Sequence, residues 1–199
     1  HGREHSFPTR RSSDLLGVSE IFLSHIYKQV FTRAEGRDGP YSLETDTHPA
    51  LPELADAALD LKDRLTALRK PMQSLSQRLR KRLSDQADTL DGDTKKRIES
   101  VCNRLTYWAE NTLTGWINML ATLEQDEKPT DSIDWMEIER IDGQAVDIGL
   151  YRHWVDPMKS FATALRPHAH GVVITSATLR DGTGDEAEDW RVARERTGT

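Results

Sequence analysis

The sequence has 199 residues, 36% of them hydrophobic and 30% charged, which suits one ordinary globular domain or two small ones. It holds no run of eighteen apolar residues and no apolar signal core near its start, so we expect no membrane partner and a cytoplasmic location. Cys102 is the only cysteine, which excludes an internal disulfide and any four-cysteine metal site built from this chain alone.

The net charge of −6 conceals a basic region in the middle of the chain. Between Lys62 and Arg104 the sequence holds twelve lysines and arginines but only six acidic residues. The ordinary interpretation of such a run is a solvated helix face. The alternative is a surface that binds a polyanion.

The first fifteen residues look foreign to the fold. Residues 6–15 resemble the translation of a sequencing adapter, Ser-Phe-Pro-Thr-Arg-Arg-Ser-Ser-Asp-Leu. We therefore interpret 1–15 as a disordered, adapter-derived scar and expect the natural chain to begin further upstream. The other interpretation is a native basic tail.

Helical periodicity dominates the chain up to residue 125. A first helix is predicted from about residue 18, with Ser19 as its N-cap, followed by a loop over 32–49. A long helix of about 38 residues then carries leucines and a methionine at alternating steps of four and three, and Pro71 should kink or divide it. Its apolar seam consists of Leu54, Leu61, Leu65, Leu68, Met72, Leu75, Leu79 and Leu83.

A second long helix is predicted over 94–125, capped by Asp93 or Thr94 after the turn residues 90–93. Two long amphipathic helices joined by a short turn must run antiparallel to bury their apolar faces. The sequence therefore predicts a helical hairpin.

The pattern changes after residue 132. Segments 133–141 and 145–155 flank Asp142-Gly143 and predict a β-hairpin, a short helix follows over 157–165, and 185–197 reads as a charged helix. Between these helices, 171–174 is rich in β-branched residues and predicts a strand buried on both faces. Hydroxyl residues follow this strand, at the end where α/β proteins place ligands.

The segment Thr175-Ser176-Ala177-Thr178-Leu179 resembles motif III of superfamily two helicases, in the form of the DinG/XPD-like branch. In that family a helical arch precedes short strands, a helix and the motif III strand, and the same order is predicted here. The resemblance implies a mainly α fold with a small α/β part, in which 16–132 form the arch-type hairpin. Residues 133–199 would then belong to an incomplete RecA-like motor domain.

The resemblance also implies an ATP-dependent DNA helicase, whose intact form uses ATP and Mg²⁺. Residues Thr175, Ser176, Ala177 and Thr178 would form the relay between the nucleotide site and the DNA track. This chain contains neither a Gly-Lys-Thr/Ser phosphate loop nor a DEAH-type acidic box, so we expect it to be an inactive fragment that binds no cofactor itself. The competing interpretation is that 175–178 merely end a strand, and an upstream iron–sulfur cluster remains an open question.

Two basic groups flank the predicted hairpin turn and are the candidate nucleic-acid contacts. They consist of Arg78, Arg80, Lys81 and Arg82 on one arm and Lys95, Lys96 and Arg97 on the other. We expect sequence-independent contacts with single-stranded or forked DNA. In that family the arch guides or gates the single strand, and we expect the chain to be a monomer.

The tryptophans, histidines and cysteine of the chain give weaker indications of function. Trp108 and Trp116 are expected to pack inside the hairpin rather than to stack on bases. His153, His168 and His170 lack a carboxylate or cysteine to complete a metal set, and Cys102 is expected to be a buried thiol.

Two rival functions stay open. The leucine seam would also suit a coiled-coil adaptor or scaffold, which should dimerise through it. A related motor that serves as an ATP-dependent nuclease would carry its nuclease residues outside this chain.

Overall fold

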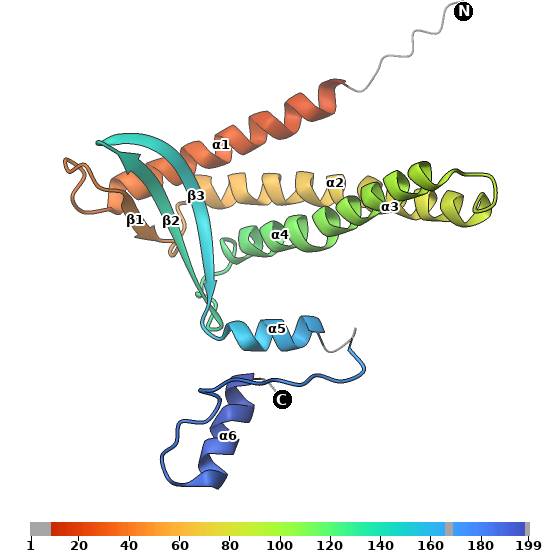
Figure 1. Ribbon diagram of the computed structural model, residues 1–199. Coiled ribbons are helices and arrows are strands. Elements are labelled where there is room, and N and C mark those ends of the chain that lie inside the picture. The colour runs from red at the N-terminus through yellow and green to blue at the C-terminus, as the bar shows by residue number, and fades with distance from the viewer. Residues whose placement is uncertain (1–8, 166–168, 198–199) are drawn as a thin grey trace, which may run out of the picture. The chain divides into compact units, whose positions relative to one another are not determined.

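The computed structural model describes residues 9–165 and 169–197 (Figure 1). These residues form a mainly helical structure with one three-stranded antiparallel sheet of order β1-β2-β3. The chain divides into two compact units, of which the smaller holds 129–134 and 152–199. The larger unit contains the long helices and most of the sheet.

Helix α1 spans Thr9–Arg33 and buries one apolar stripe. The stripe recurs every four residues and consists of Val18, Phe22, Ile26 and Val30. Two expectations about this region were wrong. Of the segment 1–15 that was predicted to be disordered, residues 9–15 are helical and residues 1–8 lie outside the described part of the chain. Ser19 lies inside the helix, where its hydroxyl donates to the Leu15 carbonyl at 2.9 Å.

Helix α2 spans Pro52–Asp85 and is continuous through Pro71. Of the two predicted effects of this proline, a kink or a division of the helix, the division is therefore wrong. Proline removes the N–H that would donate to the carbonyl four residues earlier, here that of Ala67. Both residues are exposed, which lets water solvate the freed carbonyl and lowers the cost of the proline.

The second arm of the hairpin consists of α3 (Gly92–Tyr107), a π-helical segment η1 (Trp108–Thr112) and α4 (Leu113–Thr122). The continuous helix was predicted, but the π-helical segment was not. Asp91, rather than Asp93 or Thr94, caps α3, because its carboxylate accepts from the Thr94 amide at 2.8 Å and from the Thr94 hydroxyl at 2.7 Å. The hydrogen bond from that hydroxyl lowers the pKa of Asp91.

The two arms run antiparallel, as predicted (Figure 1). Small residues, Ser76 and Cys102, meet between them. The buried Ser76 hydroxyl lies 3.4 Å from the Cys102 carbonyl oxygen, and the Cys102 thiol lies 3.7 Å from the Ser76 carbonyl oxygen. The leucine seam is only partly used inside the hairpin: Leu61 and Leu65 are buried, whereas Leu68 and Leu75 are exposed.

The sheet joins β1 (Leu43–Asp46), β2 (Ser132–Ile141) and β3 (Gln144–Trp154). The β2–β3 hairpin was predicted, and its turn residues Asp142 and Gly143 both have positive φ, at 53° and 78°, as a type I′ turn requires. Strand β1 was not predicted, because it lies inside the segment interpreted as a loop. It pairs antiparallel with β2.

The smaller unit contains α5 (Pro157–Leu165) and α6 (Glu186–Thr197), both close to their predicted bounds. The predicted strand over 171–174 was wrong: these residues form no strand, and Val173 is 93% exposed. A strand needs at least one hydrogen-bonding neighbour, and no strand in the described part of the chain pairs with this segment. A RecA-like parallel sheet is therefore not formed by these residues.

Candidate nucleic-acid interface and motif III segment

The basic group on α2 lies in the last two turns of that helix. Arg78, Lys81 and Arg82 are exposed, and Arg82 donates to the Gln86 side chain at 3.0 Å. Arg80 reaches across to the second arm, with its Nη2 3.4 Å from Asn103 Oδ1 and 3.4 Å from Thr106 Oγ1. The charged groups of Arg78, Lys81 and Arg82 therefore lie on the surface of the hairpin.

The basic group on α3 lies within the first turns of that helix. Lys96 and Arg97 are exposed and Lys95 is half-buried. Within the described residues, none of the seven cations in the two groups forms an ion pair. Four acids, Asp85, Asp88, Asp91 and Asp93, lie between the two groups in sequence, so the arms are more positive than the connecting turn. Unpaired cations on both arms are suited to phosphate contacts.

The segment that resembles motif III is a tight, exposed turn. The Thr178 amide donates to Ser176 Oγ at 3.2 Å, and the two side-chain oxygens are also 3.2 Å apart. The Leu179 amide donates to the Ser176 carbonyl at 3.4 Å. Thr175 and Ala177 are exposed as well, so all four residues of the predicted relay are accessible on one short loop.

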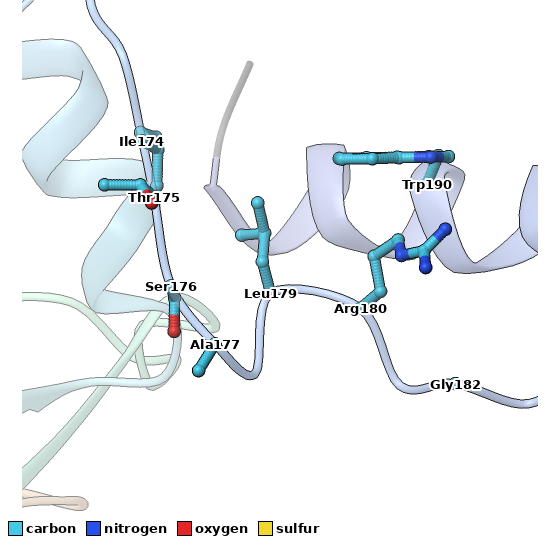
Figure 2. Close-up of a pocket in the computed structure, with 8 residues that line it drawn as sticks. All are labelled: Ile174, Thr175, Ser176, Ala177, Leu179, Arg180, Gly182 and Trp190. Carbon is cyan, nitrogen blue, oxygen red and sulfur yellow. The ribbon is translucent and has the colours of Figure 1, made fainter.

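A cavity of about 400 Å³ adjoins this loop (Figure 2). The loop forms one wall, and α6 provides Trp190, whose ring centroid lies 5.4 Å from the Arg180 guanidinium carbon. Arg180 also pairs with Glu186 at 3.2 Å. The full lining is Ile174, Thr175, Ser176, Ala177, Leu179, Arg180, Gly182 and Trp190.

Hydrogen bonds fix the end of the loop to the start of α6. Asp189 accepts from the Thr183 hydroxyl at 2.8 Å and from the Thr183 amide at 3.3 Å. The hydroxyl contact lowers the pKa of Asp189. Asp185 caps the helix by accepting from the amides of Ala187 and Glu188, and Arg196 pairs with Asp181 at 2.6 Å. The loop is thus anchored at its C-terminal side, while its hydroxyl residues stay accessible.

The other sequence candidates are placed as follows. His168 lies outside the described residues, and among the described ones no three histidines, cysteines or acids gather as a metal site. Cys102 is buried against Ser76, as predicted.

The structure corrects the expectation for the hairpin tryptophans. Trp108 and Trp116 are not packed inside: they are 47% and 48% exposed and contact each other edge-to-face, with ring centroids 6.2 Å apart. Helical spacing alone could not reveal this, because the π-helical segment between them changes the direction of the second ring.

Comparison of the chain with protein-family models, with curated proteins and with solved structures found no match. In the described part of the chain, no helix combines the length and apolar character needed to cross a membrane.

Proposed function

We propose that this chain is part of a DinG/XPD-like ATP-dependent DNA helicase and comprises its arch insertion and the motif III end of its first motor domain. The order of elements carries the proposal: a long helical hairpin, a β-hairpin, a short helix and then Thr175 to Leu179. That is the order of the corresponding parts in the helicase family that the motif resembles.

The hairpin supports the role of a guide for single-stranded DNA. Its unpaired cations lie on both arms near the connecting turn, where a passing strand could contact either. Contacts with phosphates carry no sequence information, as a motor that moves along any sequence requires. They would also make binding strongly dependent on salt.

The exposed loop supports the role of a relay. Ser176 and Thr178 form a hydrogen bond with each other, and hydroxyl groups can exchange such a partner for a carboxylate. In the intact helicase this carboxylate would come from the acidic box that binds the metal ion. The relay would then respond to the state of the nucleotide.

ATP and Mg²⁺ do not fit the residues of this chain. The sequence lacks a phosphate-binding loop, and the described residues offer no cluster of acids to hold Mg²⁺. The nucleotide site would therefore be built by other parts of the parent protein.

The decisive experiment is to sequence the coding DNA upstream of residue 16 and to express the extended protein. We expect a Gly-Lys-Thr/Ser loop and an acidic box in that order, and ATP hydrolysis that single-stranded DNA stimulates. In this protein, the double substitution Ser176→Ala/Thr178→Ala should leave hydrolysis largely intact and reduce strand unwinding. An upstream sequence without a phosphate-binding loop would contradict the proposal.

The basic groups allow a direct test on the 199-residue chain. The triple variant Arg78→Gln/Lys81→Gln/Arg82→Gln should bind a fluorescent single-stranded oligonucleotide about tenfold more weakly at low salt. Loss of up to three phosphate contacts should also make the dependence of log affinity on log salt shallower by about 2. Fluorescence anisotropy across a salt series measures both quantities.

A matched control removes the same charge from another part of the larger unit. Lys28→Gln/Arg33→Gln/Arg37→Gln lies on α1 and the loop after it and should leave binding almost unchanged. Equal losses in both triple variants would mean that only net charge matters. The hairpin would then not be the binding surface.

The adaptor hypothesis predicts a different oligomeric state from that of the helicase proposal. Leu68 and Leu75 are exposed on α2, so a coiled-coil partner could still cover them. An adaptor should sediment as a dimer that the substitution Leu68→Ser/Leu75→Ser dissociates. The helicase proposal expects a monomer with and without that substitution.

A further inference from the structure

One exposed stripe runs along α3 and combines cations with an aromatic ring. Arg97, Val101, Arg104 and Trp108 follow each other at steps of four, three and four residues. At 3.6 residues per turn these positions fall within an arc of about 60° and so share one face of the helix. All four side chains are exposed.

The π-helical segment extends this stripe to Trp116. Eight residues of uninterrupted α-helix turn about 80° past two full turns, which would direct Trp116 away from Trp108. A π-helical turn accommodates one additional residue, which removes about 100° and leaves the two rings about 20° apart. The edge-to-face contact between the rings, at an interplanar angle of 78°, agrees with this geometry.

Contacts from Thr114 and Arg69 support the π-helical segment. The Thr114 hydroxyl donates to the Ala109 carbonyl at 3.1 Å, and Arg69 on α2 donates to the same hydroxyl at 3.2 Å. Ala109 is fully buried, and the π-helical segment contacts α2. The segment is thus held by both arms of the hairpin.

We propose that this stripe, Arg97, Val101, Arg104, Trp108 and Trp116, is a stacking track for unpaired nucleotides of single-stranded DNA. The inference rests on the proposed function and adds to it a contact with the bases. Arg97 and Arg104 form no ion pair among the described residues, so their guanidinium groups can contact phosphates. The two indoles can hold base faces, which are accessible only in an unpaired strand.

The dimensions suit a short stretch of nucleic acid. From Arg97 to Trp116 the arm rises about 28 Å at 1.5 Å per residue. This length accommodates several nucleotides, within the range that single-strand binding sites cover. Asp93 lies on the same face one turn before Arg97, so the attractive part of the stripe begins at Arg97.

The test compares two oligonucleotides that carry the same phosphate charge, one of thymidines and one with abasic residues. The 199-residue chain should bind the thymidine strand about five- to tenfold more tightly than the abasic one, because only the former can stack. Trp108→Ala and Trp116→Ala should each reduce this preference without changing the affinity for the abasic strand. Trp108→Phe keeps a ring and should retain most of the preference.

Tyr41→Ala serves as the control. Tyr41 is 81% exposed, more than either tryptophan of the stripe, and it lies on a loop away from the stripe. It should leave both affinities unchanged, and circular dichroism checks that each variant folds.

The outcomes separate the track from the proposed function. Salt-sensitive binding with equal affinity for both strands would overturn the stacking track and leave the phosphate contacts of the hairpin in place. No binding of either strand would overturn both. A chain that sediments as a dimer, and that Trp108→Ala converts to a monomer, would show that the stripe is a protein interface.

Discussion

The variant Asp134→Asn is expected to lower the free energy of unfolding by about 3 kcal/mol. Asp134 accepts from Arg152 Nε at 2.7 Å and pairs with Arg152 Nη2 at 2.5 Å. The carboxylate side chain is 1% exposed and that of the arginine 11%. Removal of one partner leaves a buried charge without its counter-ion, so the loss should appear in urea unfolding followed by circular dichroism.

Two further variants isolate the cause of that loss. Glu53→Gln breaks the exposed ion pair between Lys28 and Glu53, at 3.4 Å, and should not change stability measurably. The double variant Asp134→Leu/Arg152→Met removes both buried charges and should recover part of the stability. An Asp134→Asn variant as stable as the parent would show that water reaches this pair.

The variant Gln29→Leu should cost about 3 kcal/mol, because it removes three hydrogen bonds of one buried amide. Gln29 Nε2 donates to the carbonyls of Asp46 and Thr47, at 3.2 Å and 3.1 Å. Its Oε1 accepts from the Leu51 amide at 2.9 Å. The substitution removes the side-chain partner of all three backbone groups, and thermal and urea unfolding both measure the effect.

Gln77→Leu provides the comparison, since Gln77 is an exposed glutamine on a helix. Glutamine and leucine have similar helix propensities, so this substitution tests the loss of an exposed amide alone. It should change stability by less than about 0.5 kcal/mol. If the two variants are equally stable, the loop between β1 and α2 does not depend on the Gln29 side chain.

The long elements could be predicted because their signals are repeated many times. Each turn of α2 and of the second arm supplies another apolar residue, so a local irregularity such as Pro71 does not hide the period. The β-hairpin was predictable for a different reason. Asp142-Gly143 fills the two positions of positive φ that a tight turn of this type requires.

Features that depend on distant partners could not be predicted. Strand β1 spans only four residues and forms because β2, almost ninety residues later, offers hydrogen bonds. The segment 171–174 shows the opposite case. Its β-branched residues favour a strand, but without a neighbouring strand they remain unpaired.

The candidate site was likewise predictable only in part. Charge along α2 and α3 marked the basic groups, since lysines and arginines stay near the surface wherever the helices pack. The tryptophan pair was missed because its exposure depends on one additional residue in a helical turn. The additional residue shifts the apolar period by about 100°, and the prediction of one uninterrupted α-helix did not allow for this shift.

The close approach of the two arms at Ser76 and Cys102 has a consequence for measuring motion. Cys102 is the only thiol of the chain and is 1% exposed, so a thiol reagent can reach it only when the arms separate. Its rate of modification therefore reports how often the hairpin opens. A DNA strand that binds both arms and holds them together should slow that reaction. The measurement uses the natural thiol and therefore requires no mutation.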